Sequence, residues 1–235
     1  MKALIFAAGL GERMRPLTDH TPKPLLKAGG KPLIVWHLEK LAVLGVRDVV
    51  INTSWLAAQF PATLGDGGQW GLRITYSFEG DTPLETGGGI WHALPVLGDA
   101  PFLAVNGDIW CDADFSTLPR EPVEQAHLLL VDNPEHNPRG DFALGAAGVV
   151  HADGEEKLTF AGIGMYRPSL FEDWRRVIGD ASGAHATPPR FKLAPLLRAA
   201  MARAAVTGAH HHGRWTDVGT PERLAILDAE LRACA

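Results

Sequence analysis

The sequence predicts an α/β protein built on a doubly wound, Rossmann-like mixed sheet. Three continuous apolar runs, at residues 2–7, 47–52 and 101–108, are typical of parallel strands that are buried on both faces. Helical patterns separate these runs, and strands that alternate with helices indicate a doubly wound layer. Beyond about residue 110 the candidate strands are shorter and punctuated by glycine, which predicts a smaller, strand-rich region.

In the first half of the chain, proline and glycine mark the predicted ends of the elements. Pro32 suits the first turn of an amphipathic helix, and Gly45 is a natural end for it. Residues 55–64 are predicted to be helical, residues 72–78 alternate as a strand does, and a further helix is expected to begin near Thr86.

The second half is predicted to mix short strands with three helices. Strand candidates lie at residues 126–133, 142–150 and 157–166, and helices at residues 169–178, 191–205 and 221–233. The sequence contains no repeat, low-complexity tract or obvious linker. We therefore predict a single domain over residues 1–235.

Composition excludes several classes of protein. Of the 235 residues 46% are hydrophobic, and the net charge of −5 argues against a general nucleic-acid binder. Two cysteines, Cys111 and Cys234, predict no disulfide framework and suit a reducing cytoplasm. No apolar run approaches the roughly 20 residues of a membrane helix, and the apolar N-terminal run is too short for a signal peptide. We expect a cytoplasmic protein without a membrane partner.

The glycines after the first predicted strand have two interpretations. Gly9 and Gly11 form a Gly-x-Gly pair, as in dinucleotide-binding folds, but Met14 occupies the position of the third glycine. No Gly-Lys-Ser/Thr sequence follows, so the segment is not a P-loop. The glycines alone indicate only a tight turn.

Fixed positive charge in the same loop favours phosphate binding. Bare glycine amides, guanidinium groups and ammonium groups together suit a polyphosphate. Prolines stiffen the loop, which argues against a merely solvated basic segment. The cations are Arg13, Arg15, Lys23 and Lys27, and the prolines are Pro16, Pro22 and Pro24.

Two aspartates are candidate ligands for Mg²⁺. Asp108 lies at the end of the apolar run 101–108, and ligands in open α/β sheets bind at the carboxyl ends of strands. Mg²⁺ takes one or two carboxylates and completes its shell with water and phosphate. Asp217, in the sequence RWTDVGTP, is the second candidate, although either aspartate could instead cap a helix or turn.

At these residues the sequence resembles the sugar-phosphate nucleotidylyltransferases. The stretch FAAGLGERMRPLTDHTPKP, the pair Gly107–Asp108 and the segment Trp215–Pro221 match three motifs of that family. The resemblance covers nearly the whole chain. It implies a single nucleotidyltransferase domain, with a nucleotide-binding half at about residues 1–110 and a sugar-binding half at about residues 111–235.

The resemblance also implies a reaction. The oxygen of a sugar 1-phosphate attacks the α-phosphorus of a nucleoside triphosphate, and pyrophosphate leaves; Mg²⁺ is the cofactor. The stretches PLETGGGI, VNGD, NPRGDF and FKLAPLLRAAM are similar to members that act in peptidoglycan recycling. They imply UTP as the nucleotide and N-acetylmuramate α-1-phosphate as the sugar.

Matching the motifs residue by residue assigns roles within the site. Arg15 and Lys23 are the implied catalytic residues, since they would hold the triphosphate and the reacting phosphates. Asp108 and Asp217 would hold the metal. The nucleotide-binding residues implied are Ala8, Gly9, Gly11, Glu12, Arg13, Glu79, Gly87 and Gly88. The sugar-binding residues implied are Asn106, Gly140, Asp141 and Lys192.

Two positions depart from the family pattern. Many relatives have a glutamine that reads the base where this chain has Glu79. A carboxylate only accepts hydrogen bonds, so it suits uracil, thymine or guanine and disfavours adenine. Many relatives have a second lysine for the sugar phosphate, within a Glu-Lys-Pro sequence. In this chain no proline follows Lys157, so Lys192 is a candidate for that role.

Other interpretations remain open from the sequence. A guanylyl- or thymidylyltransferase for mannose or glucose 1-phosphate would share the same motifs, and so would a non-catalytic module that binds nucleotide sugars. The run His210–His212 could hold a metal, but neighbouring residues of a strand face opposite ways, which favours a surface role. A monomer or homodimer is expected.

Overall fold

The computed structural model describes residues 1–121 and 124–234. It consists of two compact units, each assembled from separate stretches of the chain. The first unit contains Lys2–Pro83, Val105–Phe115 and Arg214–Ala235, and the second contains Leu84–Ala104 and Ser116–Gly213. Among the described residues, no helix is both long and apolar enough to cross a membrane.

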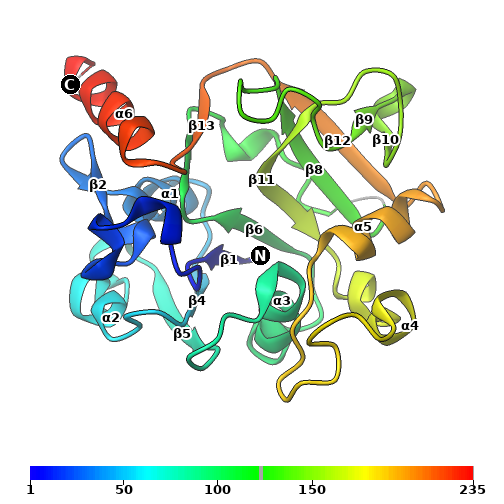
Figure 1. The fold of residues 1–235 in the computed structure, drawn as a ribbon, viewed down its shortest axis with the longest axis horizontal. Helices are drawn as coiled ribbons and strands as arrows, with labels where there is room; N and C mark the ends of the chain where they lie inside the picture. Colours follow the sequence, from blue (N-terminus) through cyan, green and yellow to red (C-terminus); the bar gives the residue numbers. More distant parts are fainter. Residues whose placement is uncertain (122–123, 235) are drawn as a thin grey trace. The chain divides into compact units, whose positions relative to one another are not determined.

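Parallel strands form the centre of the first unit. Strand β1 (Lys2–Phe6) pairs with β4 (Asp48–Thr53), and β4 pairs with β5 (Arg73–Phe78), both in parallel register (Figure 1). The inner residues of β1 and β4 are buried apolar side chains, as their continuous apolar sequences predict. All three strands end on the same side, where the predicted phosphate-binding loop begins.

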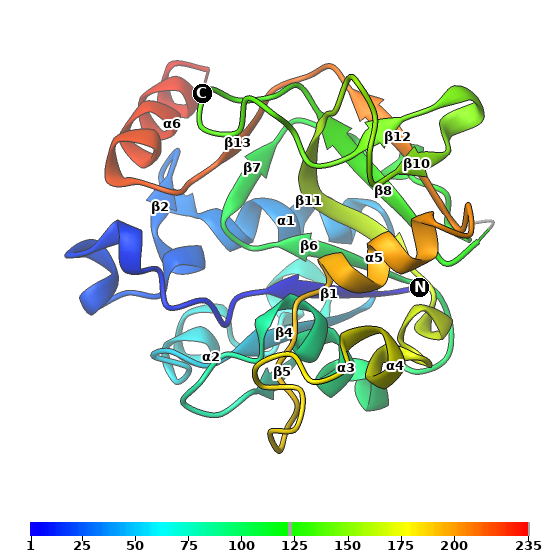
Figure 2. The same cartoon turned by 45° about the vertical axis from the view of Figure 1, so that its right-hand side comes forward.

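Helices α1 (Leu33–Val43), α2 (Gln59–Leu64) and α6 (Pro221–Ala233) belong to the same unit. The helix predicted after Pro32 and the helix predicted from Pro221 are confirmed. The prediction of a helix over residues 55–64 was too long, because Leu56 has a positive φ of 51° that interrupts a right-handed helix. Helix α6 contacts the two-residue strand β2 (Lys27–Ala28), which pairs with β3 (Lys31–Pro32) (Figure 2).

Strand β6 (Phe102–Asn106) begins in the second unit and ends in the first. The prediction that this strand extends to Asp108 was wrong, because it ends at Asn106. Gly107 turns the chain where its backbone N–H donates to the carbonyl of Phe6 at 2.9 Å, and a Cβ at this glycine would meet that oxygen at 2.6 Å. The chain then enters β7 (Ile109–Cys111), which pairs antiparallel with β13 (Trp215–Asp217).

The second unit combines parallel and antiparallel strands. Strand β8 (Ala126–Val131) pairs antiparallel with β11 (Thr159–Tyr166) and parallel with β12 (Val206–His211) (Figure 2). Strands β9 (Ala143–Leu144) and β10 (Val150–His151) form a short ladder. The helices are α3 (Glu85–Leu97), α4 (Trp174–Ile178) and α5 (Ala194–Met201). The predicted mixed α/β architecture is confirmed, while α4 and α5 are shorter than predicted.

Candidate active site

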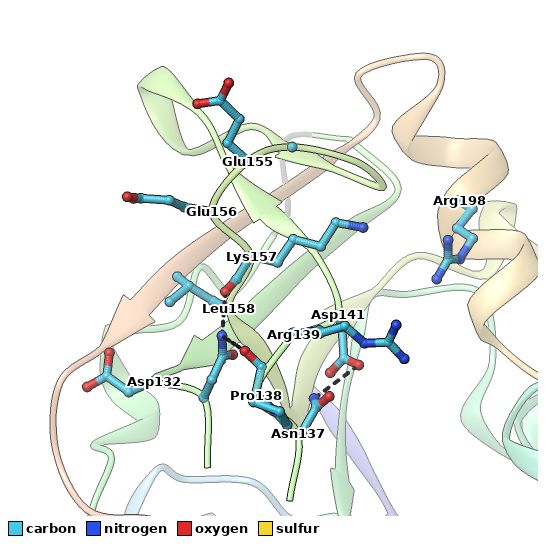
Figure 3. Close-up of a pocket in the computed structure, with 13 residues that line it drawn as sticks. Asp132, Asn137, Pro138, Arg139, Asp141, Glu155, Glu156, Lys157, Leu158 and Arg198 are labelled. Carbon is cyan, nitrogen blue, oxygen red and sulfur yellow. Dashed lines mark hydrogen bonds between the residues drawn. The ribbon is translucent and has the colours of Figure 1, made fainter. Parts of the chain in front are cut away.

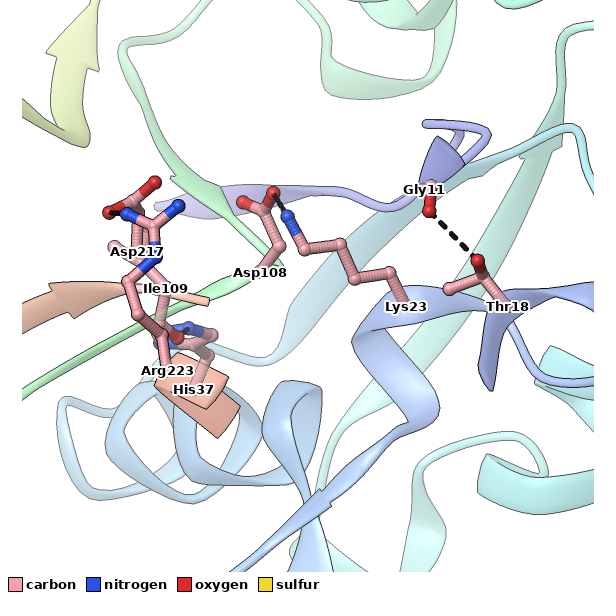
Figure 4. Close-up of polar contacts among 8 residues, drawn as sticks. All are labelled: Gly11, Thr18, Lys23, His37, Asp108, Ile109, Asp217 and Arg223. Carbon is pink, nitrogen blue, oxygen red and sulfur yellow. Dashed lines mark hydrogen bonds and ion pairs between the residues drawn. The ribbon is translucent and has the colours of Figure 1, made fainter. Parts of the chain in front are cut away.

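The loop after β1 is a chain of short turns rather than a flexible segment. Three 3₁₀ turns follow one another, at Glu12–Met14, Leu17–Asp19 and Lys23–Leu25. Gly11 has φ +66°, which favours glycine, and its carbonyl accepts the Thr18 hydroxyl at 2.8 Å (Figure 4). The loop is thus preorganised by its own hydrogen bonds.

Met14 explains why this loop is not a dinucleotide fingerprint. Its side chain is fully buried in an apolar cluster with Leu33, Trp110, Val218 and Leu227. A glycine at this position would leave a cavity in that cluster. Two members of the cluster, Trp110 and Val218, are close in sequence to Asp108 and Asp217.

The Lys23 ammonium and the Asp108 carboxylate form an ion pair within the first unit. The Nζ atom of Lys23 lies 2.5 Å from Oδ2 of Asp108, although 85 residues separate them in sequence (Figure 4). The Lys23 side chain is only 10% exposed, whereas the Asp108 side chain is 37% exposed. A rigid, nearly buried cation therefore lies beside a carboxylate that solvent can still reach.

The pairing of β7 with β13 brings Asp217 to the same place. Asp217 lies opposite Ile109 in the antiparallel register, and the Val218 N–H donates to the Asp108 carbonyl at 2.9 Å. Oδ1 of Asp217 accepts from Nη1 of Arg223 at 2.6 Å. The absence of a side chain at Gly219 makes room for that guanidinium, since a Cβ there would meet it at 1.9 Å.

The two carboxylates fit a hard divalent cation. Oxygen ligands from one or two carboxylates are what Mg²⁺ prefers. Asp108 and Asp217 come from neighbouring strand ends, and each is neutralised in the structure by a basic side chain. Both aspartates predicted from the sequence lie in one small region of the first unit.

A buried histidine supports the strand that follows Asp108. His37, on α1, is 1% exposed, and its Nε2 lies 2.9 Å from the Ile109 carbonyl oxygen. Burial lowers the pKa of His37 to about 4, so the ring is neutral near pH 7 and donates from Nε2 to that carbonyl. Helix α1 thereby fixes the start of β7.

The buried His37 predicts a loss of stability in mild acid. The pKa is about 4 in the folded protein and about 6.5 when unfolded, so the unfolded state takes up the proton first. The His37 contribution is complete above pH 6.5 and is lost as the pH falls toward 4, by ~3 kcal/mol at most. We expect His37→Gln to flatten this dependence in urea unfolding measured from pH 7.5 to 4.5. Equal slopes for the two proteins would contradict it.

The remaining residues predicted in the loop are placed as follows. Arg13 and Glu12 are exposed, Gly9 has open space around it, and Ala8 is buried. Arg15 is also exposed, and its Nε lies 3.3 Å from Asp19. Weak ion pairs at an exposed site cost little to exchange, so Arg15 can turn toward a phosphate.

Glu79 is tied into the first unit by hydrogen bonds. It is 5% exposed, and its Oε1 accepts from Asn52 Nδ2 at 2.6 Å. Oδ1 of Asn52 in turn accepts the Ala7 N–H at 2.7 Å. The chain of contacts links the ends of β5, β4 and β1. Glu79 thus has a structural role, joining these strand ends, in addition to the base contact predicted from the sequence.

In the second unit, Gly87 and Gly88 allow a close approach of the chain. A Cβ at Gly87 would meet the Phe191 ring at 2.6 Å, and a Cβ at Gly88 would meet the Pro189 carbonyl at 2.6 Å. The Gly88 N–H donates to the Phe191 carbonyl at 2.9 Å. Close packing against residues 189–192 therefore explains the glycines at these two positions, in addition to the predicted nucleotide contact. Lys192, next to Phe191, is exposed.

A polar pocket of about 900 Å³ lies in the second unit, around the stretch predicted to meet the sugar. Gly140 and Asp141 line it, as do Arg139, Lys157 and Arg198. In Figure 3 the side chains of Arg139 and Lys157 point toward the side of the pocket where Arg198 lies. Asp141 is fixed, because its Oδ2 accepts the Phe160 N–H at 2.9 Å.

The predicted sugar-binding residues divide between the units. Gly140 and Asp141 line this pocket, while Asn106 is a half-buried residue at the end of β6 in the first unit. Lys157 lines the pocket too, and its ammonium donates to the Ala152 carbonyl at 2.8 Å. Lys192 is not one of the described residues that line the pocket.

Sequence reasoning missed several residues that hold the site in place. Asn52 ends a buried strand with a polar residue, and that position was a usable signal. His37 gave none, because its partner Ile109 is far away in sequence. Thr18 and Arg223 contact nearby residues, but no local pattern indicates those contacts. Arg198 lay on a predicted helix, whose pattern does not tell which polar residue faces a pocket.

Comparison with known proteins agrees with this geometry. A family model described as nucleotidyl transferase matches residues 2–160. The N-acetylmuramate α-1-phosphate uridylyltransferase of Neisseria meningitidis serogroup B is 50% identical, over 97% of each chain. The enzyme of that name from Caulobacter vibrioides is 34% identical, over 97% of this chain and 96% of its own. A crystal structure assigned as a Bacillus anthracis glucose-1-phosphate thymidylyltransferase has a TM-score of 0.81 at 23% identity, covering 99% of this chain and 95% of its own.

The fold is that of a nucleotidyltransferase, and Lys23, Asp108 and Asp217 lie close together within its first unit. The chain belongs to the nucleotidyl transferase family, and it is a sugar-1-phosphate nucleotidyltransferase. The prediction from the sequence motifs is thereby confirmed at the level of family, fold and enzyme class.

Proposed function

We propose that the protein transfers a uridylyl group from UTP to N-acetylmuramate α-1-phosphate, releasing pyrophosphate. The observation that carries the substrate choice is the 50% identity to the Neisseria enzyme over 97% of both chains. Mg²⁺ is the proposed cofactor, and peptidoglycan recycling in the cytoplasm is the proposed setting.

The residues of the first unit suit this chemistry. Phosphoryl-type transfer needs positioning and neutralisation of charge more than covalent help from the protein. Lys23 would neutralise charge on the reacting phosphates and Arg15 on the departing pyrophosphate. Asp108 and Asp217 would hold Mg²⁺, which neutralises phosphate oxygens when bound. The Lys23–Asp108 ion pair would then be exchanged for phosphate and metal partners.

The pocket of the second unit suits an acidic sugar. N-acetylmuramate carries a lactyl carboxylate, which glucose, mannose and N-acetylglucosamine lack. Arg139 and Arg198 bring positive charge to one side of the pocket, together with Lys157, whose ammonium pairs with Asp153. Four carboxylates also line the pocket, those of Asp132, Asp141, Glu155 and Glu156, so the contrast in charge is between its sides. Arginine forms charge-assisted hydrogen bonds with carboxylates, so the arginine side chains favour an acceptor of this kind.

A substitution in the pocket tests the choice of acceptor. We expect Arg198→Ala to raise KM for N-acetylmuramate α-1-phosphate by about tenfold, the loss of one charge-assisted hydrogen bond. KM for UTP should not change, and neither should turnover of N-acetylglucosamine 1-phosphate. Arg203→Ala is the matched control, because Arg203 bonds Gln125 and is not one of the described pocket residues. An equal effect on both acceptors would contradict recognition of the carboxylate.

One further candidate keeps the mechanism and changes the substrates. The mannose-1-phosphate guanylyltransferase of Mycobacterium tuberculosis is 39% identical over 49% of this chain and 32% of its own length. A guanylyl transfer to mannose 1-phosphate is thus the second proposal. It requires GTP to be used in preference to UTP.

A further inference from the structure

Two histidines and an aspartate of the second unit form a compact cluster that the transfer reaction does not use. His210, His212 and Asp132 each offer a ligand atom, and these atoms all lie within 4.8 Å of one another. Nε2 of His210 lies 2.9 Å from Oδ1 of Asp132. The two imidazole rings are in contact, with centroids 3.9 Å apart.

The strand register explains why these three residues meet. In the parallel pairing of β12 with β8, His210 lies opposite Leu130 and His211 lies opposite Val131. The next residues, His212 and Asp132, therefore leave the two strands side by side. Alternation along β12 puts His210 and His212 on one side and His211 on the other. The expectation that the three histidines do not all share one metal agrees with this arrangement, in which His210 and His212 face one another.

The chemistry of the cluster is that of a transition-metal site. Two imidazoles and one carboxylate suit Zn²⁺ and its neighbours, whereas Mg²⁺ prefers oxygen ligands alone. Ligand atoms around a tetrahedral zinc ion lie about 3.4 Å apart, given bonds of about 2.1 Å. Asp132 and His212 are exposed, so small side-chain rotations can close the present spacing.

We propose that Asp132, His210 and His212 bind one divalent transition-metal ion of the Zn²⁺ type, with water in the remaining positions. The ion would link the carboxyl ends of β8 and β12. Asp132 also lines the pocket of the second unit, on the side away from Arg198 (Figure 3). The ion would thus sit at the edge of that pocket.

Calorimetric titration of the untagged, full-length protein with ZnCl₂, in a buffer containing excess Mg²⁺, tests the site. We expect about one equivalent to bind, and His212→Ala and Asp132→Asn each to weaken binding by at least about tenfold. CoCl₂ should give the visible absorption of a site with nitrogen ligands, and Zn²⁺ should raise the unfolding temperature.

His211→Ala is the matched control, since it removes the neighbouring histidine on the opposite side of the strand and should leave binding intact. Asp108→Asn should also retain the zinc site, which separates it from the proposed Mg²⁺ site. Absence of zinc binding, or equal loss in His211→Ala, would overturn the proposal. Circular dichroism of each variant distinguishes a lost site from a lost fold.

Discussion

Replacing Lys23 by methionine is expected to lower kcat by about 10³-fold, because a preorganised positive charge on the reacting phosphates is lost. The Lys23 side chain is 10% exposed and lies between Pro22 and Pro24, so its ammonium is already positioned and has only to exchange the Asp108 carboxylate for a phosphate. Methionine preserves the packing of the aliphatic stem. Steady-state release of pyrophosphate from UTP and N-acetylmuramate α-1-phosphate measures the effect.

The control for Lys23→Met is a lysine of the same segment. Lys27 was grouped with the loop cations from the sequence, but it is exposed in β2, beyond the last 3₁₀ turn of the loop. Lys27→Met should therefore reduce kcat by no more than about twofold. A comparable loss in both variants would indicate a general effect of basic charge rather than a specific role of Lys23.

The second large effect is expected at Asp108. Asp108→Asn should lower kcat by about 10²–10³-fold and raise the Mg²⁺ concentration needed for half-maximal activity, because one of two proposed metal carboxylates is lost. Asp217→Asn should act in the same direction. Asp99 is an exposed aspartate, and Asp99→Asn should change neither value. An unaltered Mg²⁺ requirement in Asp108→Asn would contradict metal binding by this residue.

Stability measurements separate the two roles of Asp108. Asp108→Asn leaves the nearly buried Lys23 ammonium without its counter-charge, which should cost roughly 1–2 kcal/mol of unfolding free energy at this partly exposed pair. The double variant with Lys23→Met removes both charges and should regain most of that stability. It should remain inactive. Recovery of activity in the double variant would mean that the pair is only structural.

Much of the first unit could be predicted from the sequence, because its elements are marked by patterns among neighbouring residues. Continuous apolar runs gave β1 and β4, and Pro32 and Pro221 gave the starts of α1 and α6. The motif around Lys23 and the position of Asp108 after an apolar run were enough to group them in one site. Such features depend on residues that are close together in the sequence.

The parts that were missed depend on contacts that no local sequence pattern reveals. The pairing of β7 with β13 joins residues 109–111 to residues 215–217, and neither segment is long enough to read as a strand. Arg223 pairs with Asp217 only because Gly219 leaves room for the guanidinium. The end of β6 before Gly107 depends on the Phe6 carbonyl, which no local pattern reveals.

Glycines were the least reliable guide. Gly11 has a backbone conformation that favours glycine, as its place in a turn suggested. Gly87 and Gly88 also give space to residues 189–192 in the second unit, about a hundred positions further along the chain. A glycine in a sequence indicates close approach or unusual backbone, but not which partner approaches.

Pyrophosphate release in Mg²⁺ from UTP, GTP, dTTP and ATP, each with four sugar 1-phosphates, tests the proposed function most directly. The sugars are those of N-acetylmuramate, N-acetylglucosamine, mannose and glucose. We predict the highest kcat/KM for UTP with N-acetylmuramate α-1-phosphate, and almost no turnover of ATP. Higher values for GTP with mannose 1-phosphate would contradict the proposed substrates, and absence of release from every pair would contradict uridylyl transfer itself.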